Sequence, residues 1–368
     1  MSPSRPAIPK LVDRSAIIVP LVAVVALAAV WGRSLPVAVE ILIVALLAGA
    51  VLAAVHHAEV VAHRVGEPYG SLVLAVAVTI IEVGLIITMM ITGGDKAASL
   101  ARDTVFAAVM ITCNGIVGLS LLVTALHRRV AVFNPEGTGA ALATVITLAT
   151  LSLVLPRFTT SSPGPQFTGP QLAFAAVASL VLYGLFVVVQ AVRHRDYFLP
   201  VPTEAPTPDE DHAAAPTRRV ALVSLLLLVA ALVAVVGLAK VESGTIETAV
   251  SSAGLPHSVV GVVIALLILL PETLAAVRNA RRDRVQISLN LALGSGMASI
   301  GLTIPAIAIA SIWLKGPLLL GLDPTHIVLL ALTAVVGVLT VMPGRATLLQ
   351  AGVHLAICAG FLFLAASP

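Results

Sequence analysis

Hydrophobic residues run along almost the whole chain in long stretches that short polar segments interrupt. Each stretch is close to the length, about 20 apolar residues, that a helix needs to cross a bilayer. The runs are continuous and do not alternate every second residue, which favours helices over a β-barrel. We expect about eleven transmembrane helices, at 15–31, 36–56, 70–92, 104–126, 138–156, 170–192, 220–239, 257–277, 286–311, 325–342 and 346–365.

The composition agrees with this pattern, since 59% of the 368 residues are hydrophobic and only 11% are charged. We therefore predict an all-α polytopic membrane protein whose partner is the lipid bilayer, with no sizeable soluble domain, no cofactor and no nucleic-acid partner. Cys113 and Cys358 fall within apolar runs, so we expect buried thiols and no disulfide. The sequence has no His-Glu-x-x-His motif and no pair of membrane-embedded aspartates, so we do not expect an enzyme.

The longest polar stretch, 193–219, is rich in proline and acidic residues, which is typical of a flexible linker. It divides the chain into an N-terminal segment with the first helix (1–35), a first set of five helices (36–192) and a second set of five (220–368). With an odd number of helices in each set, equivalent helices must cross the membrane in opposite directions. This is the inverted-repeat arrangement of many secondary transporters, whose binding sites lie between the repeats near the bilayer midplane.

The distribution of basic residues predicts the orientation of the chain. If the N-terminus is cytoplasmic, fifteen of the 21 Lys and Arg residues lie in cytoplasmic segments and six in external ones. Cytoplasmic loops carry such an excess of Lys and Arg. We therefore expect a retained first helix, a cytoplasmic N-terminus, a cytoplasmic linker and an external C-terminus.

Two glutamates, Glu82 and Glu272, lie inside hydrophobic runs that occupy corresponding places in the two halves. A carboxylate at that depth costs several kcal/mol unless it is protonated, paired or bound to a cation. Next to Glu272, Pro271 removes a backbone hydrogen bond and leaves the carbonyl of Leu267 without its usual partner. Carboxylate and carbonyl oxygens suit a hard cation such as Ca²⁺, which takes six to eight oxygen ligands.

The helix after each glutamate carries uncharged oxygen donors that can complete a cation shell, and we choose Asn114, Asn290 and Ser295 as candidates. Ordinary hydrogen bonding between helices is the alternative role for these residues. Each glutamate is also followed by Arg-Asp-x-Val, at 102–105 and again at 282–285. This shared order supports an internal repeat.

These residues resemble motifs of the Ca²⁺:cation antiporter superfamily, and within it the bacterial calcium (or sodium/potassium):proton antiporters. The resemblance lies in Gly66-Glu-Pro-Tyr-Gly70, Thr79-Ile-Ile-Glu82, Pro271-Glu272-Thr-Leu-Ala-Ala-Val-Arg278 and Leu291-Ala-Leu-Gly-Ser295. The common exchanger core Gly-Asn-Ala-Thr/Ala-Glu is absent from both halves. The resemblance implies two inverted five-helix repeats, an extra first helix, a bacterial inner-membrane location and a cation bound by one glutamate from each repeat.

We therefore expect a secondary active cation:proton antiporter, with Ca²⁺/H⁺ exchange by alternating access at Glu82 and Glu272. Metal and protons would compete for the same carboxylate oxygens. A Na⁺(K⁺)/H⁺ antiporter and a cation channel are the alternatives, because both would also need buried carboxylates. The ion preference, the stoichiometry and the oligomeric state stay open at this point.

Overall fold

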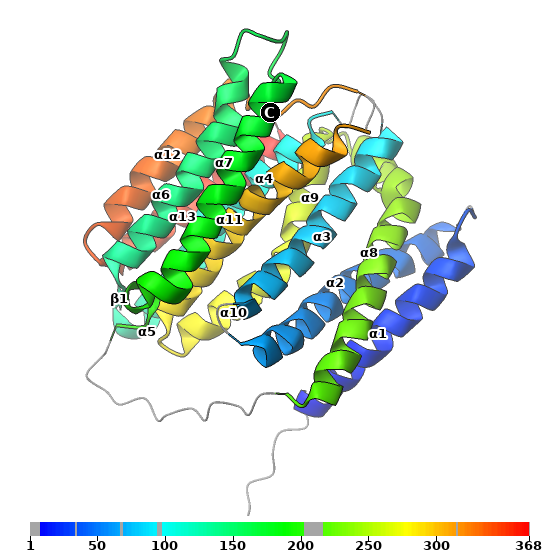
Figure 1. Ribbon diagram of the computed structural model, residues 1–368, viewed down its shortest axis with the longest axis horizontal. Coiled ribbons are helices and arrows are strands. Elements are labelled where there is room, and N and C mark those ends of the chain that lie inside the picture. The colour runs from blue at the N-terminus through cyan, green and yellow to red at the C-terminus, as the bar shows by residue number, and fades with distance from the viewer. Residues whose placement is uncertain are drawn as a thin grey trace, which may run out of the picture. The chain divides into compact units, whose positions relative to one another are not determined.

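The computed structural model describes residues 8–33, 35–66, 69–93, 98–201, 216–313 and 316–367. The described chain is almost entirely helical (Figure 1). Its elements are α1 (Ile8–Val30), α2 (Val37–Val65), α3 (Tyr69–Gly93), α4 (Leu100–Met110), η2 (Ile111–Ile116), α5 (Val117–Arg128), β1 (Val130–Val132), α6 (Pro135–Ala149), η3 (Thr150–Val154), η4 (Leu155–Arg157), α7 (Gly169–Val188), η5 (Val189–Arg193), η6 (Arg195–Phe198), α8 (Arg218–Ser252), α9 (Ser258–Ile268), α10 (Leu270–Arg281), α11 (Val285–Ala310), α12 (Pro324–Val341), β2 (Arg345–Thr347) and α13 (Leu348–Ala366).

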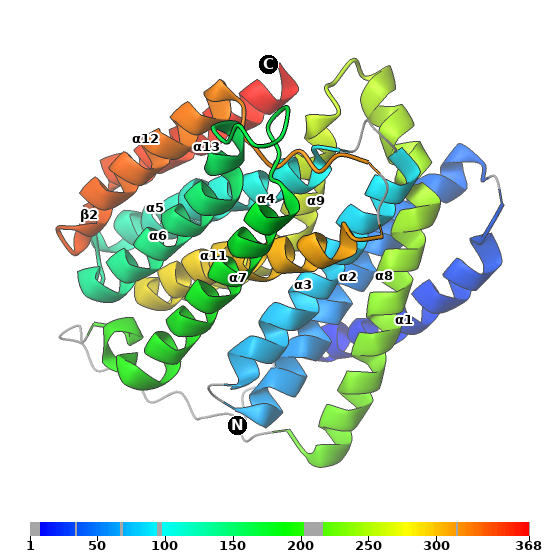
Figure 2. The same ribbon diagram turned by 45° about the horizontal axis from the view of Figure 1, so that its top comes forward.

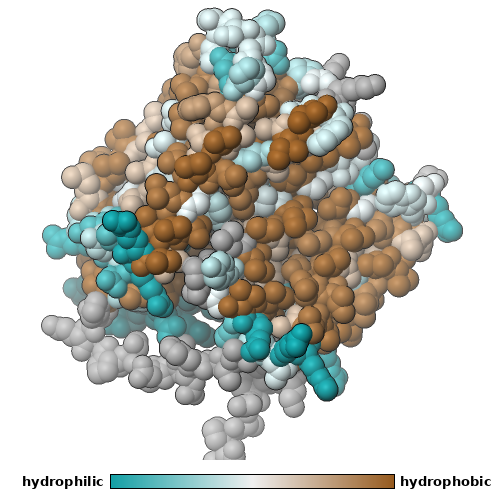
Figure 3. All heavy atoms as spheres, in the orientation of Figure 1, coloured by the Kyte–Doolittle hydropathy of each residue, from teal (hydrophilic) through white to brown (hydrophobic). Residues whose placement is uncertain are grey.

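Within the described residues, nine helical segments are long and apolar enough to cross a membrane, and the bent pair α9–α10 would make a tenth. Arg14–Val30 of α1 is apolar as well, but it is shorter than these segments and is not counted among them. Large apolar side chains are exposed on these helices, for example Leu226 and Leu349, and apolar residues cover much of the visible face in Figure 3. The predicted fold class is therefore confirmed, while the number of eleven spans stays a prediction.

Two compact units can be distinguished in the chain. Unit 1 contains α1, α2, α3 as far as Thr88 and α8 as far as Ile246, and unit 2 contains the remaining elements. The predicted linker begins in η5 and η6 and ends at α8, but its residues 202–215 lie outside the described residues. The same holds for residues 1–7 of the predicted N-terminal segment.

The helices of unit 1 pack closely where one of them carries glycine. A Cβ atom on Gly84 of α3 would lie 2.5 Å from Val236 of α8, and one on Gly237 would lie 2.4 Å from Leu27 of α1. Larger residues at these two positions would push the helices apart, because small residues let membrane helices approach each other. Glycine thus holds α8 close to both α3 and α1.

In unit 2, α11 lies against α5, α6, α7, α10 and η2, and Figure 2 shows it crossing beside α6 and α7. Two short strands pair antiparallel in this unit, with Ala131 of β1 opposite Ala346 of β2. They precede α6 and α13 along the chain. The long central helix therefore connects the elements that carry most of the predicted site residues.

Candidate functional site

Glu82 lies near the middle of α3, in unit 1, and only 2% of its surface is exposed. The helix runs through this position without a break. Its carboxylate is therefore buried in the middle of a helix, away from the stabilising dipole of a helix terminus.

Glu272 has a different backbone setting, because the helix is interrupted just before it. α9 ends at Ile268, α10 begins at Leu270, and the two helices are bent by 49°. Pro271 stands in the first turn of α10 and has no N–H to donate to the carbonyl of Leu267. The break that the sequence predicted at this proline is thus confirmed.

The break places opposite helix ends on the two sides of one short connection. Glu272 is 6% exposed and lies in the first turn of α10, where the positive end of the helix dipole stabilises a carboxylate. The last carbonyls of α9 lie at a negative helix end, and such ends can coordinate cations in transporters with discontinuous helices. The connection therefore offers oxygen ligands from both a side chain and the backbone.

Asn114 lies in η2, a π-helical segment between α4 and α5, and it is fully buried. Its Nδ2 donates to Thr333 Oγ1 at 3.0 Å, and its Oδ1 lies 3.2 Å from His354 Nδ1. The other ring nitrogen of His354, Nε2, lies 3.1 Å from Thr340 Oγ1. Asn114 is therefore tied to both α12 and α13.

The chemistry of these groups fixes the direction of the hydrogen bonds. Because Asn114 Oδ1 carries no hydrogen, His354 must donate from Nδ1, and neutral His354 then accepts the Thr340 hydroxyl proton at Nε2. The Thr333 hydroxyl donates a hydrogen bond to the carbonyl oxygen of Leu329 at 2.8 Å. Both ends of the Asn114 amide are thus engaged, which leaves one Oδ1 lone pair for another ligand. No local sequence pattern connects His354 with Asn114, because the two residues lie far apart in the chain.

Asn290 of α11 is engaged in contacts of another kind. Its Nδ2 donates to the carbonyl of Phe198 in η6 at 2.6 Å, and its Oδ1 accepts from Gln286 at 2.8 Å. The amide therefore ties α11 to the segment that follows α7.

Ser295 is half-buried on α11, directly before Gly296. A Cβ atom on Gly296 would lie 2.6 Å from Thr112 Oγ1 in η2, so this glycine allows α11 to approach the π-helical segment. Of the predicted site residues, Glu272, Asn114, Asn290 and Ser295 belong to unit 2, and Glu82 belongs to unit 1. Among the described residues, no three His, Cys, Asp or Glu side chains gather as a possible metal site.

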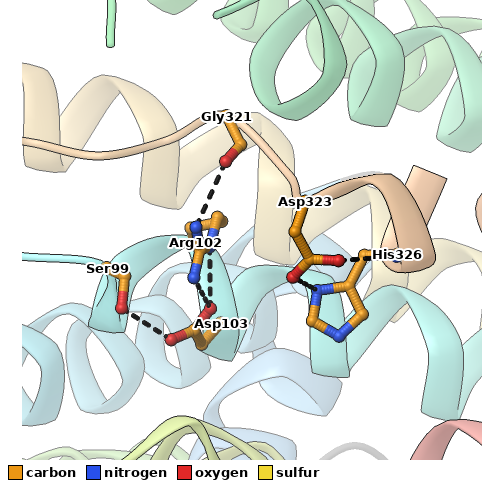
Figure 4. A network of polar contacts seen from close by, with 6 residues as sticks. All are labelled: Ser99, Arg102, Asp103, Gly321, Asp323 and His326. Carbon is orange, nitrogen blue, oxygen red and sulfur yellow. Dashed lines mark hydrogen bonds and ion pairs between the residues drawn. The ribbon is translucent and has the colours of Figure 1, made fainter. Parts of the chain in front are cut away.

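The two Arg-Asp motifs both make ion pairs in unit 2. Asp103 is held by Arg102 at 2.8 Å and by the Ser99 hydroxyl at 2.8 Å, and Arg102 also donates to the carbonyl of Gly321 (Figure 4). In the second copy, Asp283 pairs with Arg128 at 2.7 Å. The motifs therefore anchor helix ends.

Close to the first motif, Asp323 accepts from the backbone N–H of His326 at 3.0 Å and caps α12 (Figure 4). Its other oxygen lies 2.9 Å from His326 Nδ1. The acidic and basic side chains in this part of unit 2 are thus used for structural contacts.

Known proteins share both the sequence and the fold of this chain. The protein y4hA of Sinorhizobium fredii is 49% identical in sequence to this chain, over 88% of this chain and 87% of y4hA. The sodium-potassium/proton antiporter ChaA of Escherichia coli is 33% identical over 98% of this chain and 99% of its own length. The solved structure of the H⁺/Ca²⁺ exchanger CAX covers 98% of this chain and 93% of its own, with a TM-score of 0.70 at 16% identity.

The family model described as "Sodium/calcium exchanger protein" matches two segments, 35–192 and 223–366. Together these segments cover most of the chain. This protein therefore belongs to the sodium/calcium exchanger family of membrane transporters.

Proposed function

We propose that this exchanger moves Ca²⁺ against protons at one central site formed by Glu82 and Glu272. The observation that carries the proposal is that Glu82 and Glu272 are both buried, one in the first and the other in the second of the two segments that match the family model. A dehydrated divalent cation needs such charge, because leaving water is tolerable only when carboxylates replace the hydration shell. Asn114, Ser295 and Asn290 are the uncharged candidates for the same shell.

Exchange would follow from competition for the carboxylate oxygens. Burial favours the protonated form of a carboxyl group, whereas a bound cation favours the ionised form. Proton binding would therefore release the cation, and cation binding would release protons. Two coupled carboxyls allow up to two protons for each Ca²⁺, and their titration would belong to the pair.

Alternating access needs a part that moves while the site stays intact. The second and seventh long helices, α2 and α8, both contribute to unit 1. We propose that they act together as the gate. The matches of the family model at 35–192 and 223–366 support an inverted repeat with halves at 36–192 and 220–368. We propose a bacterial inner-membrane location, and the distribution of basic residues supports a cytoplasmic N-terminus.

Na⁺(K⁺)/H⁺ exchange is the second candidate, and a specific observation favours it. The relative that is 33% identical over almost the whole chain is named a sodium-potassium/proton antiporter. All arguments on the two glutamates apply to this reaction as well, with a smaller charge to neutralise.

The test is proton movement in proteoliposomes, followed with a pH-sensitive dye after addition of Ca²⁺, Na⁺ or K⁺. We expect the largest signal with Ca²⁺ and its loss in Glu82→Gln and in Glu272→Gln, with the double variant no worse than either. Glu136→Gln, which changes an exposed glutamate of α6, is the matched control and should behave as the wild type. A larger signal with Na⁺ or K⁺ would establish the second candidate, and near-normal exchange by a correctly inserted single variant would overturn the shared site.

A further inference from the structure

A third buried glutamate, Glu242, lies in unit 1 and is not explained by the proposed site. It belongs to α8 and has 0% of its surface exposed. Among the described residues, neither of its carboxylate oxygens has a hydrogen-bond partner. A buried carboxylate in this state is costly unless a positive charge accompanies it.

A second carboxylate and a hydroxyl lie beside Glu242. Glu40, in the first turn of α2, is near enough for its charge to act on Glu242. Thr245, three residues further along α8, donates its hydroxyl to Glu40 Oε1 at 3.1 Å. The same hydroxyl lies close to Glu242, but it has only one proton to donate, so it cannot satisfy both carboxylates.

Nearby features of the fold compensate the negative charge of Glu40 but not that of Glu242. The positive end of the α2 dipole stabilises a carboxylate in the first turn, whereas Glu242 lies well inside α8. The closest lysine in sequence, Lys240, places its ammonium group over the Trp31 ring at 5.0 Å. Glu242 therefore needs a positive charge from elsewhere. One proton or one monovalent ion would leave a net negative charge, and a divalent cation would neutralise both groups.

We propose that Glu40, Glu242 and Thr245 form a second cation site, which binds a divalent metal ion and is separate from Glu82 and Glu272. These side chains supply fewer oxygens than the six to eight that Ca²⁺ takes, so binding should be weak, on the order of 10⁻⁴ to 10⁻³ M. Glu242 lies roughly 36 Å along the α8 axis from Arg218, which is about the thickness of a bilayer core. Since Arg218 is expected at the cytoplasmic end, the second site lies near the external end of α2 and α8.

The site gives a role to the charge on α2 and α8 in the transport cycle. A cation released outward would be held for a time beside the gate helices, and external protons would compete with it for the same carboxylates. This role rests on the proposed function, whereas the binding site itself does not.

Equilibrium binding of radioactive Ca²⁺ to the purified full-length protein tests the inference. We expect two ions per chain in the wild type and one in Glu242→Gln, with the weaker of the two lost. Glu82→Gln should lose the other ion and keep the weak one. Glu247→Gln is the matched control, because this glutamate lies on the same helix, has His257 at 3.8 Å, and should leave both ions bound.

The outcomes separate this inference from the proposed function. If Glu242→Gln binds as many ions as the wild type, the second site is wrong while the central site can stand. If Ca²⁺ binding survives in Glu82→Gln and is abolished in Glu242→Gln, the second site stands and the central Ca²⁺ site fails. No binding in the wild type overturns both. Thr245→Val, which removes only the hydroxyl, should weaken the second site several-fold, and gel filtration identifies any variant that does not fold.

Discussion

Buried polar side chains are the residues of this chain that cost the most free energy in a membrane helix, compared with apolar side chains. Glu82, Glu272 and Glu242 are carboxylates, and each requires a proton, a cation or a donor to compensate its burial. Asn114 and His354 instead compensate each other, since each satisfies a polar atom of the other. The first kind of residue can bind and release a charge, whereas the second kind fixes neighbouring helices.

The contact between His354 and Asn114 should be measurable as a coupling energy. Replacing both residues by Ala should destabilise the protein by less than the sum of the two single changes, because each single change leaves the other polar group unsatisfied. We expect this difference, the coupling energy, to be about 1 kcal/mol. Unfolding by SDS titration in mixed micelles measures the four free energies. His354→Ala combined with Thr124→Ala is the control pair, since Thr124 bonds to its own helix at Ser120, and it should be additive. Additivity in the main pair would contradict the hydrogen bond.

The ion pair between Arg128 and Asp283 predicts a pH dependence of stability. The hydrogen bond from Arg128 and its charge hold the pKa of Asp283 below the ordinary value. The pair therefore stabilises the folded protein above the unfolded-state pKa, near 4, and this contribution is lost as the pH falls through the folded-state pKa. Asp283→Asn should lower the melting temperature slightly at neutral pH and have no effect at the lowest pH. Asp196→Asn is a control for the general effect of removing an exposed acid. An equal shift at both pH values would rule out the ionic contribution.

At the scale of the elements, two of the candidate site residues lie where helices are interrupted. η2 carries Asn114, and the break between α9 and α10 precedes Glu272. π-helical segments and broken membrane helices occur often at functional sites, because they free backbone groups and redirect side chains. Both interruptions involve elements of unit 2 that contact α11, namely η2 and α10.

The sequence indicates only one of these two interruptions, the break between α9 and α10, and there is a physical reason for the difference. Pro271 indicates the break between α9 and α10, because proline cannot donate a backbone hydrogen bond. η2 contains no proline, and its distortion accompanies tertiary contacts of Asn114 with residues more than two hundred positions away. Hydrophobic runs were sufficient to find most of the helices and the two glutamates of the proposed site. Glu242 was missed because its meaning depends on Glu40 and Thr245, which only the folded chain brings to it.

The approach of α11 to η2 depends on a glycine and can be tested with a matched pair. Gly296→Ala would place a Cβ 2.6 Å from Thr112 Oγ1, which is itself bonded to the carbonyl of Ala108 at 2.8 Å. Either the helices separate or this bond is lost, so we expect a loss of stability of about 1 to 3 kcal/mol. Gly294→Ala meets no atom within 4 Å and should be neutral or slightly stabilising. Equal effects of the two changes on SDS unfolding would contradict this packing.

At the scale of the whole molecule, the prediction of two inverted halves rests on the family match and on the distribution of basic residues. The family model matches the chain in two segments, and the basic residues divide fifteen to six between the two predicted sides. Inverted halves require equivalent motifs at opposite ends of the membrane. On the predicted threading, Arg102 and Asp103 are external, whereas Asp283 and its partner Arg128 are cytoplasmic.

Labelling of single cysteines tests this threading directly. The two native thiols, Cys113 and Cys358, are buried and free, so they can be replaced by Ala to give a cysteine-free background. In intact cells, an impermeant maleimide should label Ser161→Cys, before α7, and Ser367→Cys, after α13. It should label Asp196→Cys, after α7, only when the membrane is permeabilised. This result is expected because moving the Arg-rich segments across the membrane would reverse the positive-inside distribution. The opposite pattern at all three positions would reverse the orientation, and labelling of Ser161→Cys and Asp196→Cys from the same side would show that α7 does not span the membrane.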